Sequence, residues 1–304
     1  NMKADEVESL LSDRDPVNPK WEGKADHQRV RWYQAAQRRR KESEAATEIE
    51  EAIGSLVHAS EHGDEKVLDA FAQAYQPVLD GMLETLGRLG IQFDRFTKES
   101  LFVTNGDVAK LMAELGRLDI NGVADNGAQY LDLGQRGLKG KTEFFYRRGD
   151  GSSLYATRDI AYHRWKWTQC SELINVLGED HKLQAQQVGL TLEELGERRP
   201  EVMFYSFIKL PEGKMSTRRG NVVFMDDLLE EAHAQAADVL RERRPGMNEA
   251  EMDAIAEAVG TSAVRFNIVS VSPEKGFTFR WEDALSFEAG SAPFIMYSHT
   301  RACS

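Results

Sequence analysis

The sequence predicts an α/β fold in which helices alternate with the strands of a doubly wound parallel sheet, with long helices on both sides of this region. Two observations carry the prediction. Between residues 151 and 210, apolar runs of strand length alternate with segments of helical period, and this order favours parallel pairing. Residues 26–89 and 225–271 instead place apolar side chains at three- and four-residue steps, which is typical of helices.

Composition narrows the class of protein further. The 304 residues are 41% hydrophobic and 29% charged, as expected of a folded globular chain rather than a disordered one. The formal net charge of −12 argues against a surface coated with basic residues for indiscriminate nucleic-acid binding. The two cysteines, Cys170 and Cys303, are far apart and lack metal-ligand spacing. No apolar run approaches the roughly 18 residues that span a bilayer. We therefore expect a cytoplasmic protein without disulfides, structural metal or membrane contact.

The first part of the chain predicts helices followed by a mixed region. Residues 26–89 are expected to form two long helices separated at Gly63 and Asp64. The segment from Gly90 to Tyr146 changes to short β-like runs with glycine at many junctions, which predicts a mixed α/β region. The expected strands cover residues 93–96, 100–103, 129–133 and 142–147.

The second part predicts the parallel sheet and a helical end. The expected order is a helix over 156–170, a buried strand over 173–177, a helix over 181–195 and a strand over 202–210. Helices over 228–243 and 249–271, a loop over 273–281 and a helix over 287–303 complete the chain. Ligands of such sheets bind beyond the carboxyl ends of the strands, and the densest polar residues of this sequence follow the two strands.

Two motifs resemble ligand sites but lack a feature that each kind of site requires. The glycines from Gly134 to Gly140 resemble a phosphate-binding loop, but the β-like run that follows them opens no helix to hold the phosphates. His58 and His62 lie one helical turn apart, yet the glutamate between them is not next to the first histidine as metalloprotease chemistry requires. We interpret the first as a turn and the second as an exposed helix face.

Tyr155 and Asp159 form a pair with a clear chemical use. They are four residues apart, so they share one face of the predicted helix. A carboxylate accepts two parallel hydrogen bonds from a guanidinium, and an aromatic face stabilises the same cation. Taken alone, the pair fits two interpretations equally well: a guanidinium site, or an aspartate near a helix N-terminus with a half-buried tyrosine.

A cationic loop follows the second strand of the predicted sheet. The string Lys214-Met215-Ser216-Thr217-Arg218, flanked by Gly213 and Gly220, resembles the KMSK signature of class I aminoacyl-tRNA synthetases. Attack of a carboxylate on the α-phosphate of ATP builds charge on the leaving pyrophosphate, and positioned cations stabilise that charge. The two glycines are expected to act as hinges that let the loop close on bound ATP.

Three motifs in order resemble one family within this class. Tyr155-Ala-Thr-Arg-Asp159-Ile-Ala, then Val176-Leu-Gly-Glu-Asp-His181, then the cationic loop are similar to arginyl-tRNA synthetases. The resemblance covers residues 90–304, whereas residues 1–89 match only in composition. The acidic balance suggests a salt-adapted archaeal source.

The resemblance implies a fold and a set of domains. The implied fold is the second half of a class I synthetase nucleotide-binding sheet (Rossmann-like, HUP), with a helical and mixed insertion and C-terminal helices. The implied domains are the connective insertion over 1–135, the nucleotide-binding fold over 136–225, linker helices over 226–288 and the start of the anticodon-binding domain over 289–304.

The resemblance also assigns roles to individual residues. Arginine would be bound by Tyr155, Asp159 and His181. The catalytic residues would be Lys214, Ser216 and Arg218. ATP would be bound by Gly178, Asp180, Lys214, Met215, Ser216 and Arg218, and tRNA by His299 and Arg301.

The activity implied is that of an arginine–tRNA ligase. Arginine would attack ATP, bound as its Mg²⁺ complex, to form arginyl-adenylate, and the arginyl group would pass to the 3′ end of tRNA(Arg). The partners implied are L-arginine, ATP and tRNA(Arg), and the protein is expected to be a monomer. The HIGH signature that such enzymes need is absent from the sequence, so we expect the 304-residue chain to be an internal fragment that is inactive alone.

Two other interpretations are open at the level of sequence. A class I synthetase for another amino acid would keep the cationic loop but would not need Asp159 beside Tyr155. A non-catalytic synthetase-like protein that binds RNA or protein partners is the second. Pyrophosphate exchange with different amino acids, and a HIGH signature in the upstream coding sequence, distinguish the three.

Overall fold

The computed structural model describes residues 2–13, 18–42, 46–209, 224–284, 286 and 290–304. The chain divides into two compact units that are each built from separated stretches of sequence. Unit 1 contains residues 1–43, 75–93 and 206–304, and unit 2 contains residues 44–74 and 94–205. No helix within the described ranges has the length and apolar character needed to cross a membrane.

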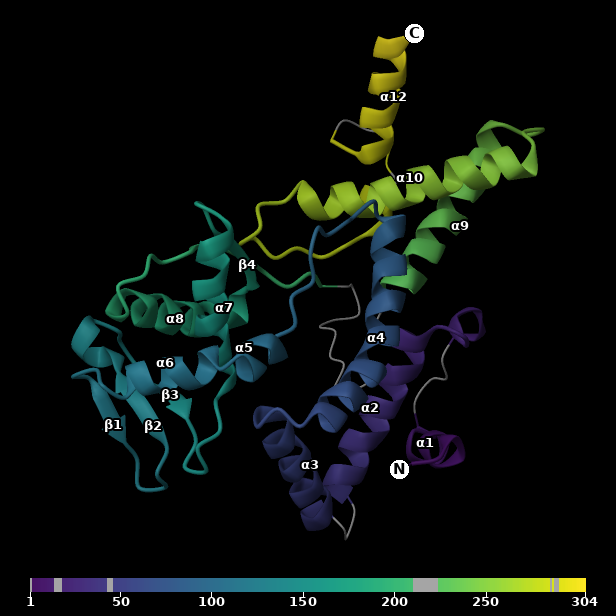
Figure 1. Ribbon diagram of the computed structural model, residues 1–304. Helices are drawn as coiled ribbons and strands as arrows, with labels where there is room; N and C mark the ends of the chain where they lie inside the picture. Colours follow the sequence, from purple (N-terminus) through teal and green to yellow (C-terminus); the bar gives the residue numbers. More distant parts are fainter. Residues whose placement is uncertain (1, 14–17, 43–45, 210–223, 285, 287–289) are drawn as a thin grey trace. The chain divides into compact units, whose positions relative to one another are not determined.

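Unit 2 contains two small sheets and the helices around them (Figure 1). Strands β1, β2 and β3 are antiparallel neighbours, and β4 pairs with β5 in parallel, with Ile174 opposite Glu201 and Gly178 opposite Tyr205. The parallel pair confirms the predicted α/β class. The elements are α3 (Ala46–Glu61), the first part of α4 (Glu65–Arg88), α5 (Ser100–Thr104), α6 (Asp107–Leu115), β1 (Asn121–Val123), β2 (Gln129–Asp132), η2 (Leu133–Arg136), β3 (Glu143–Arg147), α7 (Tyr155–Gln169), β4 (Ile174–Gly178), η3 (Glu179–His181), α8 (Lys182–Glu194) and β5 (Glu201–Tyr205).

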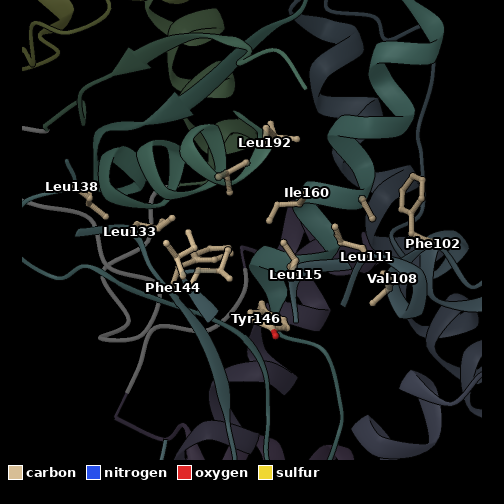
Figure 2. Packing of buried hydrophobic residues seen from close by; sticks show 14 residues of the cluster. Phe102, Val108, Leu111, Leu115, Leu133, Leu138, Phe144, Tyr146, Ile160 and Leu192 are labelled. Atoms are coloured by element: carbon tan, nitrogen blue, oxygen red, sulfur yellow. The ribbon is translucent and has the colours of Figure 1, made fainter. Parts of the chain in front are cut away.

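The core of unit 2 joins α7 to the antiparallel sheet and to α6 and α8 (Figure 2). Ile160 of α7 and Leu192 of α8 are fully buried, and both belong to one cluster with Tyr146 of β3. Thr157 is also fully buried, and its hydroxyl donates to the backbone oxygen of Tyr146. These contacts fix the rotation of α7 about its axis, because one face of the helix is committed to the core.

We expect Tyr146→Phe to lower the free energy of unfolding by about 1–2 kcal/mol, because the phenol oxygen lies 2.7 Å from Asn121 Oδ1 and 3.1 Å from Gln129 Oε1 in a buried setting. The midpoint of urea unfolding measures the change. Tyr130→Phe on the neighbouring strand, where the ring is only partly buried and lies against Phe145, is the matched control and should change stability by less than about 0.5 kcal/mol. Equal effects of the two substitutions would contradict the role given to the buried hydroxyl.

Unit 1 is helical. Its longest packed pair is α9 with α10, and Gly260 lets the two backbones approach, since a Cβ there would lie 2.8 Å from the backbone carbonyl of Ala232. Asn248 begins α10 by accepting hydrogen bonds from the backbone of Ala250 and Glu251. The elements are α1 (Ala4–Leu10), η1 (Pro19–Trp21), α2 (Ala25–Glu42), the second part of α4, α9 (Met225–Arg243), α10 (Glu249–Val269), α11 (Trp281–Ala284) and α12 (Ala292–Cys303).

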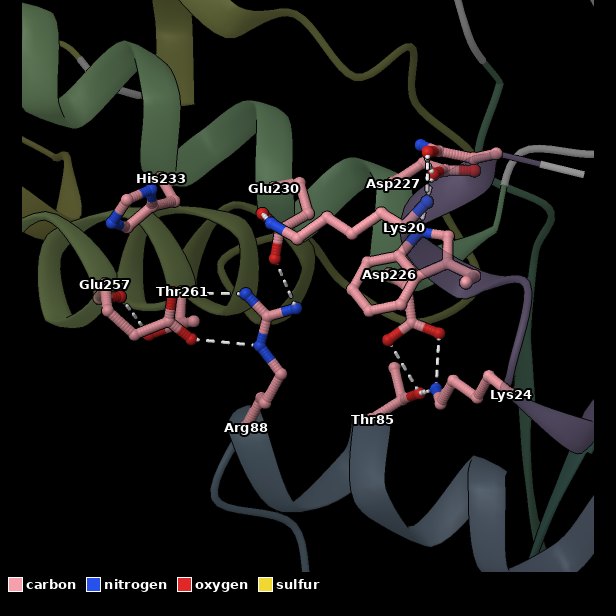
Figure 3. A network of polar contacts seen from close by, with 12 residues as sticks. Lys20, Lys24, Thr85, Arg88, Asp226, Asp227, Glu230, His233, Glu257 and Thr261 are labelled. Atoms are coloured by element: carbon pink, nitrogen blue, oxygen red, sulfur yellow. Dashed lines mark hydrogen bonds and ion pairs between the residues drawn. The ribbon is translucent and has the colours of Figure 1, made fainter. Parts of the chain in front are cut away.

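A buried polar network joins three of these helical segments (Figure 3). The carboxylate of Asp226, at the start of α9, accepts hydrogen bonds from Lys24 Nζ and, at 2.9 Å, from Thr85 Oγ1 of α4. His27 Nε2 of α2 lies 2.8 Å from the same carboxylate. Burial raises the pKa of Asp226, but the hydrogen bonds from Lys24, His27 and Thr85 outweigh it and hold the pKa below its ordinary value.

Several predicted elements differ in the structure of the first half. The span 26–89 holds three helices rather than two, since α2 ends at Glu42 and α3 begins at Ala46. The predicted strand 100–103 is helix α5, because burial of Phe102 in the core of unit 2 outweighs the weak strand preference of its neighbours. Residues 93–96 have no regular structure, and α6 and β1 were not predicted. The strands over 129–133 and 142–147 are confirmed as β2 and β3.

The second half follows the prediction more closely. Helices α7, α8, α9 and α10 are confirmed within a few residues. The strand predicted over 202–210 ends at Tyr205, and the last helix begins at Ala292 rather than at 287. The strand over 173–177 is present as β4, but it is not buried, since Ile174 and Val176 are 56% and 61% exposed. Within the described residues β4 pairs only with β5, and the exposed side chains of Met203 and Tyr205 on β5 lie in the same short sheet.

Candidate active site

Helix α7 presents Tyr155 and Asp159 on the side away from the core. Leu154 has an extended backbone and α7 begins at Tyr155, so Asp159 follows one turn later. Thr157 and Ile160 are buried in the core. Tyr155 and Asp159 lie on the other side of the helix, where Tyr155 is 52% exposed and the Asp159 side chain is 26% exposed. The predicted pair is thus on one accessible face of a helix whose rotation the core determines.

Acidic residues surround the start of α7. Arg158 forms ion pairs with Glu61 of α3 and, at 3.3 Å, with Glu99, and Ser153 donates to Glu61. Partial burial, followed by the charges of Glu99 and Asp159, raises the pKa of Tyr155. The phenol is therefore protonated at neutral pH and available as a hydrogen-bond donor, in a region of negative charge that suits a cationic ligand.

His163 lies behind Asp159, one further turn along α7. Its Nδ1 atom is 2.7 Å from the backbone oxygen of Asp159 and 3.2 Å from Oδ1 of the same residue. Its Nε2 atom is 2.7 Å from Asn175 Nδ2 of β4 and 3.2 Å from Lys166 Nζ. These contacts connect the accessible carboxylate on α7 to strand β4.

The carboxyl end of β4 carries three further predicted site residues. Gly178 is the last residue of the strand, Asp180 follows in η3, and His181 is the residue from which α8 begins. A Cβ on Gly178 would lie 2.6 Å from Asp180 Oδ1, so a larger residue here would displace the Asp180 side chain. Asp180 and His181 are exposed, with Oδ2 and Nε2 3.9 Å apart. This is the edge of a parallel sheet at which ligands bind.

The remaining predicted residues lie elsewhere. Lys214, Met215, Ser216 and Arg218 are outside the described residues. His299 and Arg301 are exposed on α12, which belongs to unit 1, and His299 Nε2 lies 3.6 Å from Cys303 Sγ. The structure therefore groups Tyr155, Asp159, Gly178, Asp180 and His181 in unit 2, and the roles assigned to these five residues and to the other six stay predictions.

Two features bear on metal binding. His58 and His62 stack on each other along α3, with ring centroids 4.0 Å apart. Among the described residues, Asp26, His27 and Asp226 are the group of three that brings potential ligand atoms close together. The Lys24 ammonium pairs with Asp226 and, at 3.5 Å, with Asp26 of this group.

A family model described as the catalytic domain of class I (R) tRNA synthetases matches residues 22–281. The chain belongs to the class I arginyl-tRNA synthetase family. The match includes Tyr155, Asp159 and the carboxyl end of β4, so the geometry described above lies within the family's catalytic domain.

Curated relatives agree with the arginyl-tRNA synthetase family. The chain is 46% identical over 282 residues to the arginine–tRNA ligase of Methanocella arvoryzae, covering 92% of this chain and 49% of that protein. It is 41% identical over 290 residues to the arginine–tRNA ligase of Halorubrum lacusprofundi, covering 92% of this chain and 48% of that protein. The chain thus spans about half the length of these relatives.

Solved structures show the same fold. The arginyl-tRNA synthetase of Thermus thermophilus superposes with a TM-score of 0.72 at 23% identity, covering 98% of this chain and 55% of that one. The enzyme from Plasmodium falciparum superposes with a TM-score of 0.67 at 14% identity, covering 98% and 48%.

Sequence reasoning missed the residues that support the site. His163 is four residues beyond Asp159, the spacing that places two side chains on one helix face, so this signal was present in the sequence. Glu61 and Glu99 come from segments far from α7 along the chain, and no local pattern connects them to Arg158.

Proposed function

We propose that the complete protein to which this sequence belongs is an arginine–tRNA ligase that forms arginyl-adenylate from L-arginine and ATP and transfers arginine to tRNA(Arg). The observation that carries the proposal is the accessible pair of Tyr155 and Asp159 on α7, within a matched class I (R) catalytic domain. A guanidinium offers parallel N–H groups to a carboxylate and a flat cationic face to a phenol ring. This chemistry distinguishes arginine from the substrates of other synthetases.

The first step joins arginine to adenylate. Asp159 and Tyr155 hold the side chain of arginine, with His181 near the strand end, while Gly178 and Asp180 line the adenosine pocket. An oxygen of the arginine carboxylate attacks the α-phosphate of ATP, which enters as its Mg²⁺ complex, and pyrophosphate leaves. Lys214, Ser216 and Arg218 stabilise the charge that develops on the leaving pyrophosphate.

The second step transfers the amino acid. A ribose hydroxyl of the 3′-terminal adenosine of tRNA(Arg) attacks the carbonyl carbon of arginyl-adenylate, and AMP leaves. His299 and Arg301 on α12 contact the tRNA. Both steps depend on placing reactants and charges correctly rather than on a covalent enzyme intermediate.

We also retain the organisation expected from the sequence. The proposed domains are an insertion over 1–135, the nucleotide-binding fold over 136–225, linker helices over 226–288 and the start of an anticodon-binding domain at 289. We propose that the protein acts in the cytoplasm as a monomer. Size-exclusion chromatography with light scattering tests the oligomeric state.

Pyrophosphate exchange tests the proposed substrate. The complete protein, with tRNA present, is assayed separately with arginine, lysine, cysteine and glutamate. We expect exchange with arginine at least about 100-fold above the others, because a site built for a guanidinium leaves its polar groups unpaired with another side chain. Exchange with a different amino acid identifies another synthetase of the same class. No exchange from a folded protein with any of the four indicates a non-catalytic relative.

A further inference from the structure

His163 is a buried histidine that none of the proposed chemical steps uses. Its side chain is only 3% exposed, and it lies on α7 between the accessible Asp159 and the strand β4. Its two ring nitrogens have different kinds of partner. Nδ1 faces two oxygen atoms of Asp159, which are acceptors, at 2.7 and 3.2 Å. Nε2 faces two nitrogen atoms, those of Asn175 and Lys166, which are donors.

The orientation of the Asn175 amide determines which nitrogen of His163 carries the proton. Lys166 Nζ has only hydrogens to offer and lies 3.0 Å from Asn175 Oδ1, so the amide oxygen faces the ammonium group. The amide nitrogen then faces His163, 2.7 Å from Nε2. Nε2 must accept that hydrogen bond, so the proton of the neutral imidazole is on Nδ1 and points toward Asp159.

The surroundings of His163 favour Nε2 as the acceptor nitrogen of the ring. Every described group in contact with Nε2 is a donor, and one of them, Lys166, is an ammonium whose other side lies over the Tyr162 ring at 4.5 Å. Burial lowers the pKa of Lys166, while the Asp159 and Cys170 groups act in the opposite direction. A hydrogen on Nε2 would face the Asn175 amide nitrogen at 2.7 Å and the Lys166 ammonium at 3.2 Å, both of which are donors.

We propose that His163 is a positioning residue for the arginine site: its Nδ1–H group donates to the backbone oxygen of Asp159 and, lying 3.2 Å from Oδ1, favours the carboxylate orientation that receives the guanidinium. The inference rests on the proposed function of Asp159. A carboxylate on a partly exposed helix face otherwise rotates freely about its last side-chain bond. The Nδ1–H group, already bonded to the backbone oxygen of Asp159, lies 3.2 Å from Oδ1, and its positive end attracts that oxygen while Oδ2 is left for the substrate.

The same contacts connect the amino-acid pocket to the nucleotide pocket. Asn175 is on β4, three residues before Gly178, and it bonds to both His163 and Lys166 of α7. The relative placement of α7 and β4 is therefore fixed at the point where both contribute to the proposed site. Supporting side chains of this kind orient the groups that touch a ligand and commonly alter affinity by about 10- to 100-fold in metal sites.

The test compares two substitutions at this position in the complete protein. His163→Leu fills the space but removes Nδ1, whereas His163→Asn retains an N–H donor near the position of Nδ1. We expect His163→Leu to raise the KM for arginine about tenfold and to leave the KM for ATP within about twofold, in line with loss of a supporting group. His163→Asn should recover most of the affinity for arginine. Ile160→Val, a buried change in the core-facing side of α7, should alter neither KM.

The outcomes separate this inference from the proposed function. An unchanged KM for arginine in His163→Leu, an equal rise in both KM values, or no recovery in His163→Asn overturns the positioning role. Asp159→Ala is measured alongside: if it leaves the arginine KM unchanged, the assignment of Asp159 itself fails.

Discussion

Replacement of Asp226 by alanine is expected to lower the free energy of unfolding by about 3–5 kcal/mol, among the largest effects of any single substitution in unit 1. Asp226 is 3% exposed, and the side chains of Lys24 and His27 that contact it are 8% and 1% exposed. Removing the carboxylate takes away the nearer counter-charge of the buried Lys24 ammonium, whose other one, Asp26, lies 3.5 Å from Nζ. It also removes the bond from the Thr85 hydroxyl to Asp226, which joins α4 to the start of α9.

Equilibrium unfolding in urea, followed by far-ultraviolet circular dichroism, measures this loss. Glu231→Ala, an exposed residue on the same helix whose carboxylate bonds only to Gln235 among the described contacts, is the matched control. It should change stability by less than about 0.5 kcal/mol. A cost below about 1 kcal/mol for Asp226→Ala would show that the Lys24 ammonium reaches water in the native protein and that the network adds little.

The same carboxylate predicts part of the acid sensitivity of the fold. The pKa of Asp226 is lower in the folded protein than in the unfolded chain, so its contribution is fully present above the unfolded value of about 3.9 and is lost as pH falls toward the folded value. Asp226→Asn cannot titrate and lacks this loss. We expect the stability difference between native protein and Asp226→Asn to be constant from pH 5 to 7 and to shrink below about pH 4.

Asp159→Ala is expected to lower kcat/KM for arginine by at least about 100-fold, since loss of a paired carboxylate removes a charge-assisted, two-point contact and leaves the guanidinium in a site without its counter-charge. The effect should be concentrated in the KM for arginine, with the KM for ATP changed by less than about twofold, because Asp159 is assigned to the amino acid alone. Asp159→Asn keeps the shape and one acceptor oxygen, and we expect it to retain only a small part of the lost activity.

Exchange kinetics in the complete protein measure these values. Glu172→Ala, which removes an exposed acidic side chain from the segment between α7 and β4, is the matched control and should leave both KM values unchanged. A rise in the ATP KM equal to the rise for arginine would mean that Asp159 supports the whole site rather than the arginine side chain. Unchanged kinetics would show that Asp159 does not bind arginine, and the guanidinium would then have no described acceptor on α7.

Local pattern was sufficient for most of the second half of the chain. The alternation of helical and strand-like segments after Gly151 predicted α7, β4, α8 and β5 in the order found, and it predicted that the two strands are parallel. Four-residue spacing placed Tyr155 and Asp159 on one face of α7. These features are readable from sequence because helical period and strand length are properties of short stretches.

Other elements required contacts between distant residues. The composition of residues 100–103 favours a strand, but Phe102 is buried in the core of unit 2 as part of helix α5. The apolar run of β4 predicts a buried strand, but Ile174 and Val176 are exposed. Burial depends on which layers cover each face of the sheet. In both cases tertiary packing outweighs local preference, and the contacts that decide it come from residues outside the local stretch of sequence.

The candidate site also has some features that the sequence predicts and others that depend on tertiary contacts. By itself the sequence determined the residue types of the candidate site: a phenol and a carboxylate one helical turn apart, and polar residues at the end of a parallel strand, in an order that resembles the family. Only the tertiary structure decided which groups lie against them, namely His163 Nδ1 at the backbone oxygen of Asp159 and the amide of Asn175 at His163 Nε2. The reason is physical. A side chain's identity fixes which bonds it can make, whereas the direction of a proton depends on which donors and acceptors the fold brings within about 3 Å of it.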